Sequence, residues 1–205
     1  MKTKQITLYT AIELAEHHPE VYDKVVRDHA FAVFSDSFWA EHIKEDFLEI
    51  TKRMGFEITR IYFDTDRGDC SFDGSYKHRA SMILNILEHT PWDEELKTIG
   101  YQLLDAQNRM DGSLEAEIRS YGRWGKLMKI DVEDAADDGS FEYTNDYIDR
   151  FELSTAKIEN AVNELAHWLL MQLRSEEEWI TSEDYFLDCA NNSGWMFTQH
   201  GNLEY

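Results

Sequence analysis

Two segments of the chain alternate between apolar and charged positions, which is typical of strands with one buried and one solvent-facing side. They are SLEAEIRS (113–120) and KLMKIDVE (126–133), and YGRWG (121–125) joins them as a hairpin loop with two glycines. ITRIYF (58–63) and CSFDGSY (70–76) are rich in aromatic or β-branched residues and flank a turn that contains Gly68. We expect these four segments to form an antiparallel sheet.

The remaining pattern is largely helical. Apolar positions recur near every 3.6 residues in 10–34, where Pro19 opens a second helix, and in 35–56, where Ser35 or Ser37 is a candidate cap and Gly55 ends the helix. Further helices are predicted over 81–89, 92–110 and about 155–179, followed by a short acidic helix capped by Thr181 or Ser182, and WMFT (195–198) is predicted as an edge strand. Without a regular βαβ alternation, this order predicts an α+β fold, with a small antiparallel sheet packed against several amphipathic helices.

The length and composition favour one domain that spans residues 1–205. A chain of 205 residues with 42% hydrophobic content can bury a sizeable core, and only 2 prolines and 10 glycines interrupt it. Because the N-terminus has no apolar run typical of a signal peptide and no stretch is apolar enough to span a membrane, we expect a soluble cytoplasmic protein. Cys70 and Cys189 lie far apart, which predicts reduced thiols.

Charge is the strongest compositional signal, since 41 acidic and 20 basic residues give a formal net charge of −21. This excess argues against direct binding to nucleic acid or to a membrane. Residues 130–149 hold eight acids and no base. The stretch is either a solvated face that maintains solubility or a surface that occupies a basic groove normally filled by nucleic acid. The candidate partner-binding acids are Asp131, Glu133, Asp134, Asp137, Asp138, Glu142, Asp146 and Asp149.

Arg123 and Trp124, in the hairpin loop between the two alternating segments, are of residue types that often anchor protein interfaces. They are therefore further candidates for contact with a partner. The alternative is an ordinary hairpin loop.

A dense group of carboxylates, Asp64, Asp66, Asp69 and Asp73, lies within FDTDRGDCSFDGSY (63–76). An EF-hand register fails here, because Gly68 falls at the fifth position of the loop and Ser75 at the twelfth. Asp and Gly are also typical turn residues, so a hairpin turn is the favoured interpretation and a divalent-metal enzyme the alternative. The eight histidines are scattered and no nucleophile or phosphate-binding motif occurs, so we expect neither catalysis nor a cofactor.

GFEITRIYFDTDRGDCSFDGSY (55–76) resembles a segment of uncharacterised phage and prophage proteins, some of which carry the description "antitoxin of a toxin–antitoxin stability system". The similar positions are Trp39, Glu45 and Asp46 in the preceding helix, then Ile61, Tyr62, Phe63, Gly68, Asp69, Phe72 and Gly74. IGYQLLDAQ, LEAEIRSYGRWGK, MKIDVE and LAHWLLMQLRSEEEWITSED extend the likeness over most of the chain from about residue 8. Two departures are DTDR, where that family has the aromatic-rich SGFWSQ, and Cys70, where a Gly or Ala is usual. The resemblance implies a phage-derived cytoplasmic protein and transfers no catalytic residue.

Together, these features predict a phage-derived acidic protein that inhibits a host defence or nucleic-acid-processing protein, by nucleic-acid mimicry or as an antitoxin-like factor. The expected partner is a host protein with a basic groove. The wide apolar stripe of the 155–179 helix also suggests a homodimer.

Overall fold

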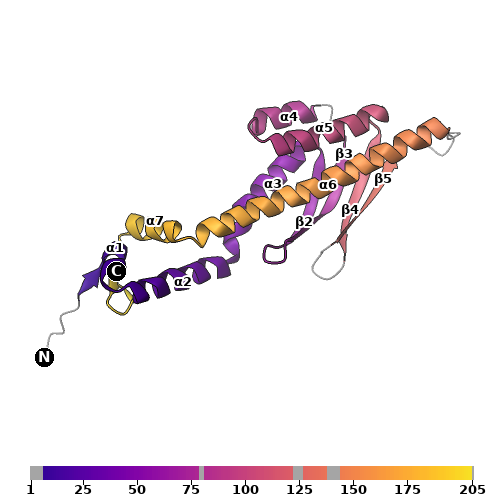
Figure 1. Cartoon of the computed structure of the whole chain (residues 1–205). Coiled ribbons are helices and arrows are strands. Elements are labelled where there is room, and N and C mark those ends of the chain that lie inside the picture. Colours follow the sequence, from indigo (N-terminus) through magenta and orange to yellow (C-terminus); the bar gives the residue numbers. More distant parts are fainter. Residues whose placement is uncertain (1–6, 79–80, 122–126, 138–143, 205) are drawn as a thin grey trace. The chain divides into compact units, whose positions relative to one another are not determined.

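The computed structural model describes residues 7–78, 81–121, 127–137 and 144–204, and over these ranges it confirms the α+β class with seven α-helices and two antiparallel sheets (Figure 1). The chain forms two compact units, described separately below. Unit 1 comprises Met1–Glu41 and Arg174–Tyr205, and unit 2 comprises His42–Leu173. The assignment of one domain over 1–205 stays a prediction.

The sheet of unit 2 has four antiparallel strands in the order β2-β3-β4-β5, and all four were predicted from the sequence. Their bounds are β2 (Phe56–Asp64), β3 (Asp69–Lys77), β4 (Leu114–Tyr121) and β5 (Leu127–Asp134). β4 and β5 pair over their whole length, so the predicted hairpin is confirmed, although its loop lies outside the described residues.

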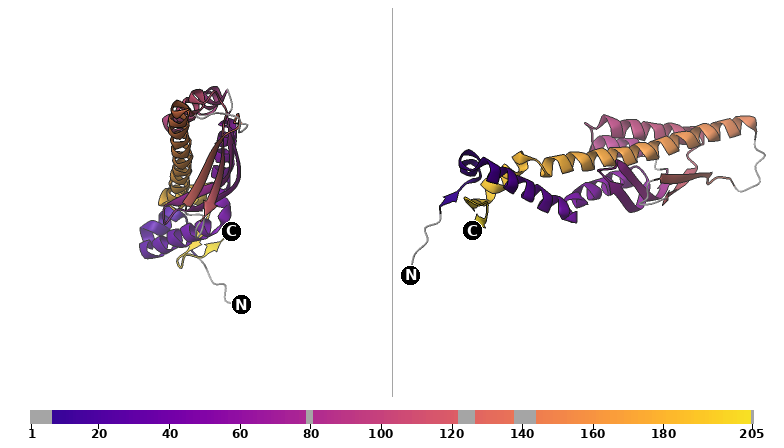
Figure 2. Two further views of the ribbon diagram at one scale, coloured as in Figure 1. Left: turned by 90° about the vertical axis from the view of Figure 1, so that its right-hand side faces the viewer. Right: turned by 60° about the horizontal axis from the view of Figure 1, so that its bottom comes forward.

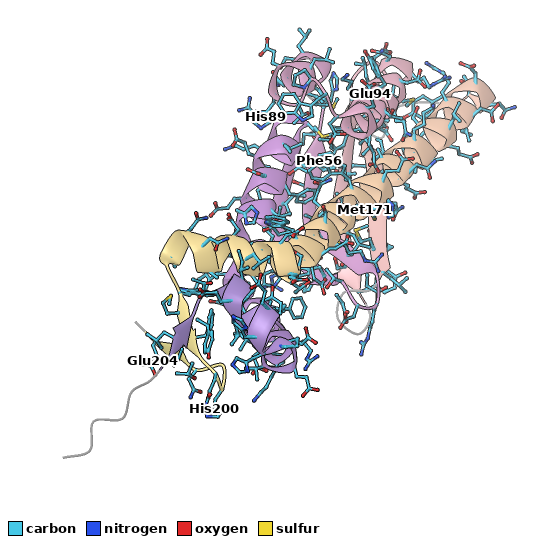
Figure 3. All side chains as sticks on the ribbon, turned by 60° about the vertical axis from the view of Figure 1, so that its left-hand side comes forward. Phe56, His89, Glu94, Met171, His200 and Glu204 are labelled. Atoms are coloured by element: carbon cyan, nitrogen blue, oxygen red, sulfur yellow. The ribbon has the colours of Figure 1, made fainter. Side chains whose placement is uncertain are left out.

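Helices cover one face of this sheet (Figure 2). They are α3 (Glu41–Arg53), α4 (Met82–His89), α5 (Glu94–Arg109) and α6 (Asn145–Ile180), of which α6 belongs to unit 2 as far as Leu173. The Phe47 ring of α3 lies 5.6 Å from that of Phe72 in β3 and 6.4 Å from that of Trp168 in α6. The aromatic contacts thus join two helices to the sheet, and Phe56 points into the same core (Figure 3).

A buried amide closes the start of β4. Gln107 of α5 accepts a hydrogen bond from the Leu114 backbone N–H at 3.1 Å and donates one to the Leu114 carbonyl at 2.8 Å. The side chain therefore supplies the pair of bonds that a neighbouring strand would give, which buried backbone groups require.

Unit 1 combines short helices with a second sheet in the order β1-β6-β7. Its elements are β1 (Leu8–Tyr9), α1 (Ala11–His17), α2 (Pro19–Ser35), the 3₁₀ helix η1 (Ser37–Ala40), the end of α6, α7 (Glu183–Ser193), β6 (Met196–Thr198) and β7 (Leu203–Glu204). Tyr22, Phe186 and Phe197 lie in its core, and the Tyr22 hydroxyl donates a 2.7 Å hydrogen bond to Glu183. The unit thus joins residues from both ends of the sequence.

Two local features differ from the sequence prediction, and one is confirmed. β6 was predicted as an edge strand, but it is the central strand of its sheet, because β1 and β7 pair with it on either side. β1 and β7 were not predicted, since two residues are too short to give a detectable alternation. Asp36, which accepts a hydrogen bond from the Phe38 N–H at 3.1 Å, is the cap that we assigned to Ser35 or Ser37. Ser182 is the confirmed cap of α7.

Helix α6 begins ten residues before the predicted start. Thr144 accepts a hydrogen bond from the Tyr147 N–H at 3.2 Å, and an ion pair between Asp146 and Arg150 at 3.2 Å follows on the first turns. Acidic residues near a helix N-terminus are stabilised by the helix dipole. The acidic run that suggested a surface segment is therefore partly the start of this helix.

Candidate functional site

The four aspartates of residues 63–76 do not converge. Asp64 ends β2, its carboxylate accepts a 3.0 Å hydrogen bond from the Arg67 N–H, and Gly68 adopts a φ of 73° in the turn that follows. Asp66 lies in that turn, and Asp69 pairs with Asp64 as the first residue of β3. Asp73 is four residues further along the strand, about 13 Å away. The arrangement is that of the predicted hairpin turn.

Asp73 has a structural partner on each side. Its carboxylate accepts a 2.6 Å hydrogen bond from the Ser120 N–H of β4 and a 3.2 Å bond from the Tyr62 hydroxyl of β2. The β3–β4 pairing ends at Gly74 and Ile118, so this carboxylate satisfies a backbone donor just beyond the ladder. Asp73 therefore ties three strands together.

Gly74 follows from the close packing of β2 on β3. A Cβ atom at this position would lie 2.4 Å from the Glu57 carbonyl oxygen. Glycine is thus required at position 74 because the backbones of β2 and β3 approach closely.

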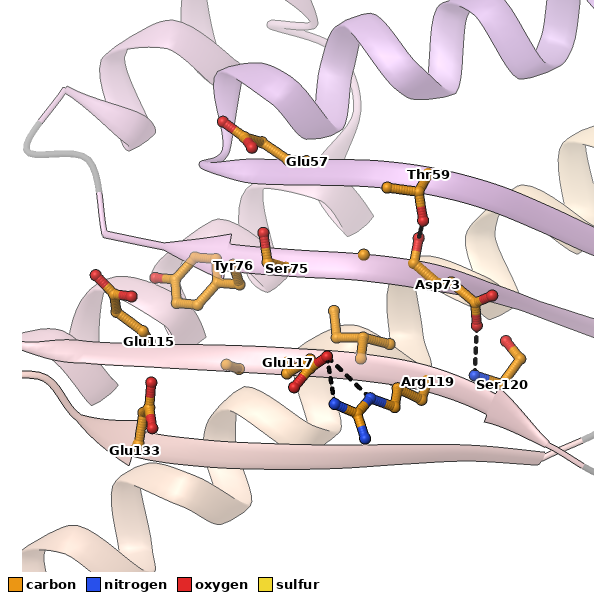
Figure 4. A pocket seen from close by; sticks show the side chains of 13 residues that line it. Glu57, Thr59, Asp73, Ser75, Tyr76, Glu115, Glu117, Arg119, Ser120 and Glu133 are labelled. Carbon is orange, nitrogen blue, oxygen red and sulfur yellow. Dashed lines mark hydrogen bonds and ion pairs between the residues drawn. The ribbon is translucent and has the colours of Figure 1, made fainter.

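The face of the sheet opposite the helices carries an open hollow of about 580 Å³ (Figure 4). Residues from all four strands line it, and its charged residues are five acids and one base: Glu57, Asp73, Glu115, Glu117, Glu133 and Arg119. Strand alternation explains the set, since the apolar neighbours Leu114, Ala116 and Ile118 of β4 are buried on the other side. We call this surface the acidic open face.

Like charges lie directly opposite one another on the acidic open face. Glu115 of β4 is the register partner of Glu133 in β5, and Glu117 is the partner of Asp131. Two like charges on directly opposite residues of neighbouring strands destabilise a sheet. Ion pairs offset part of this cost, between Lys77 and Glu115 at 2.9 Å, Arg119 and Glu117 at 2.6 Å, and Lys129 and Asp131 at 2.6 Å.

Two carboxylates that line the hollow, Glu57 and Glu133, have no ion-pair partner among the residues that the structure describes. Glu133 is exposed at the end of β5, and Glu57 is exposed on β2. The hydrogen bond with Glu115 and, more weakly, the charges of Glu57 and Glu133 raise the pKa of the Lys77 ammonium. Glu57 and Glu133 therefore lie near a cation without a direct ion pair, and both remain exposed to an external one.

The predicted partner-binding acids divide between different surfaces. Asp131 and Glu133 lie on the acidic open face, whereas Asp137, Asp146 and Asp149 are exposed beyond the sheet and on the first turns of α6. Asp138, Glu142, Arg123 and Trp124 lie outside the described residues.

Asp134 faces the other way and accepts a 2.7 Å hydrogen bond from the Tyr147 hydroxyl of α6. Burial by itself raises the pKa of Asp134, but hydrogen bonds from Ser113, Tyr147 and the Ala136 backbone outweigh it and lower the pKa below its ordinary value. The contacts of Asp134 are therefore those of an acid that anchors β5 to a helix.

Sequence reasoning missed Glu57, Glu115 and Glu117. The alternation of SLEAEIRS does place Glu115 and Glu117 on the solvent side, but the strand order that sets them beside Asp131 and Glu133 cannot be read from one segment. An acidic run contains residues that are adjacent in sequence, whereas this face is assembled from four strands.

No three His, Cys, Asp or Glu side chains in the described ranges are grouped so that they could hold a metal ion. Cys70 is held in the neutral state, because burial raises the pKa of its thiol to about 12. Within the same ranges, no helix has the length and apolar character needed to cross a membrane.

Fold and surface together define an α+β protein whose larger sheet has helices on one face and, among the described residues of unit 2, an acidic surface on the other. The chain belongs to the family described as "Domain of unknown function (DUF8835)", which matches residues 39–183. This range contains the whole four-stranded sheet. No curated protein and no solved structure matches the chain.

Proposed function

We propose that the protein is an acidic binding protein that inhibits a host protein by occupying its basic groove with the acidic open face. The observation that carries the proposal is the hollow whose charged lining comprises five acids and one base. On β4, Glu115 and Glu117 lie about 7 Å apart along the strand, and each has an acid of β5 about 5 Å away across the sheet. Such an array can take the place of phosphates against lysine and arginine side chains.

The like-charge pairs support a functional rather than a structural use of these carboxylates. The two pairs of facing acids, Glu115 with Glu133 and Glu117 with Asp131, destabilise the folded sheet. They are not needed for solubility, because the net charge of −21 already provides it. Local conflicts of this kind are expected where a surface serves binding at the expense of stability.

The resemblance of residues 55–76 to phage and prophage proteins suggests the biological setting. We infer a phage-derived protein that acts in the host cytoplasm, against a defence or nucleic-acid-processing protein or as an antitoxin-like factor. A basic groove is the feature that such a target would share with any nucleic-acid-binding protein.

The proposal is tested by capture from bacterial lysate with three baits: the wild type, the Glu57→Gln/Glu133→Gln variant, and a control. The control, Glu88→Gln/Glu95→Gln, removes the same charge from exposed positions on α4 and α5. We expect the wild type and the control to retain a basic protein that added salt releases. The affinity of that protein for the Glu57→Gln/Glu133→Gln bait should be about tenfold lower. Equal retention by all three baits would contradict the proposal.

The alternative function, a divalent-metal enzyme built on Asp64 to Asp73, would require carboxylates that meet around one ion. The register of β2 and β3 separates Asp73 from the turn, so the geometry favours binding over metal chemistry there. Thermal unfolding with Mg²⁺, Mn²⁺ or Ca²⁺ should leave the midpoint unchanged, and stabilisation lost in Asp64→Asn would restore the alternative.

A further inference from the structure

Strand β5 is an edge of the four-stranded sheet with an unused row of backbone groups. The Ala135 N–H donates to the Ser113 carbonyl at 3.0 Å, so odd-numbered residues of β5 direct their peptide groups toward β4. Met128, Ile130 and Val132 therefore direct theirs outward, where no strand of the described chain pairs with them. Such an edge can accept another strand.

The apolar layer under β5 is also incomplete. Met128, Ile130 and Val132 are half-buried, whereas the corresponding residues of β4 are fully buried. A hollow of about 580 Å³ lies between β5 and the start of α6. Val132, Ile148 and Phe151 form its apolar side, Ile148 being 41% exposed, and the acids Glu133, Asp134, Asp137 and Glu152 form its rim. The core of unit 2 thus extends to this edge and ends there without a cover.

The charges of β5 identify the strand that would fit. On its solvent side, β5 carries Lys129, Asp131 and Glu133 in order. If a second β5 pairs antiparallel with Ile130 opposite Ile130, each Lys129 faces the Asp131 of the other copy. Met128 then faces Val132 on the apolar side.

We propose that a second copy of this chain binds along β5, so that the two four-stranded sheets join into one across a twofold axis at Ile130. Each copy contributes the same strand, which is the commonest form of protein dimer. The Lys129–Asp131 ion pair within each strand becomes part of a four-charge cluster.

Neighbouring registers do not satisfy the same charges. Moving the twofold axis to Lys129 or Asp131 sets two identical charges opposite each other, and a shift that mixes odd with even residues would put apolar side chains on the solvent face. In the proposed register, Lys129 faces an opposite charge. Within the chain, by contrast, Arg119 faces Lys129 and Glu117 faces Asp131, so like charges face each other. The charges of β5 are thus better matched to a second β5 than to its own neighbour.

This dimer differs from the one suggested by the 155–179 helix. Ile158, Ala161, Val162 and Leu165 of that helix are buried within a single copy, so its wide apolar stripe is already covered. The inference also stands apart from the proposed function, since it needs no partner protein.

Sedimentation velocity at physiological ionic strength, which screens the repulsion between two acidic copies, tests the proposal. We expect a concentration-dependent dimer in the wild type that weakens at least about tenfold in Lys129→Glu, because two attractive pairs become repulsive. The double variant Lys129→Glu/Asp131→Lys restores opposite charges and should restore the dimer. Lys77→Glu changes the net charge equally on the same face and should have no effect.

A cysteine pair tests the register independently. Ile130→Cys should form an intermolecular disulfide on mild oxidation, because directly opposed residues lie within bridging distance, whereas Met128→Cys should not. A wild type that stays monomeric, a dimer insensitive to Lys129→Glu, a folded double variant that does not recover, or equal cross-linking of the two cysteine variants would each overturn the proposal.

Discussion

At the scale of single residues, aspartates that the sequence offered as a possible metal site have structural roles in the fold. Asp73 belongs to a motif with the density of a metal site, yet both of its carboxylate oxygens accept hydrogen bonds from neighbouring strands. Composition alone could not separate these roles, because the difference lies in which donors the strand register brings within reach.

Removing the Asp73 carboxylate should destabilise unit 2. In Asp73→Ala, the Ser120 N–H loses a charged acceptor, and we expect the free energy of unfolding to fall by about 2 kcal/mol. Asp66→Ala, in the exposed turn, is the matched control and should change it by less than about 0.5 kcal/mol. Urea unfolding of both variants gives the comparison, and equal stabilities would argue against the bridging role.

His29 should make the stability of the protein depend on pH. Its ring lies 5.4 Å from those of Phe186 and Trp195, and burial lowers its pKa. The unfolded chain therefore takes up a proton near pH 6.5 while the folded chain does not, so stability falls as the pH drops below that value. Thermal unfolding between about pH 7.5 and pH 5 should show a steeper loss for the wild type than for His29→Phe. Parallel profiles would show that the ring is not held neutral.

At the scale of elements, periodicity in the sequence predicted the four strands of the larger sheet and most helices. The start of α6 was missed because its first residues belong to the acidic run 130–149, although Tyr147, Ile148 and Phe151 supply apolar positions at helical spacing. Thr144 and contacts such as Tyr147 with Asp134 stabilise this start. The strands β1 and β7 were missed because two residues carry no period. Local pattern thus defined the long elements, and tertiary contacts defined the rest.

Asp93 joins two helices and offers a test of such contacts. One carboxylate oxygen caps α5 by accepting the Leu96 N–H at 2.9 Å, and the other accepts the Trp168 indole N–H at 2.9 Å. Asp93→Ala should lower the free energy of unfolding by about 2 kcal/mol, since it removes the cap and leaves a buried donor unpaired. Asp93→Asn, which keeps an acceptor oxygen, should lose less. A loss in Asp93→Ala no larger than that in Asp93→Asn, by chemical denaturation, would contradict the double role.

At the scale of the whole molecule, the net charge was evident from the sequence, but its distribution was not. The acid-rich stretch 130–149 contributes only part of the acidic open face, and Glu57, Glu115 and Glu117 come from elsewhere in the chain. A surface assembled from four strands requires the strand order, which alternation does not supply. The division of the chain into two units likewise depends on contacts between its two ends.

The most direct test of the central claim is competition between this protein and nucleic acid for the captured partner. Labelled duplex DNA bound to that partner is titrated with the wild type and with Glu57→Gln/Glu133→Gln, and its release is followed by fluorescence anisotropy. The acidic open face predicts that the wild type displaces the DNA and that the variant requires about tenfold more protein to do so. Failure of the wild type to displace the DNA, or equal displacement by the variant, would contradict the account.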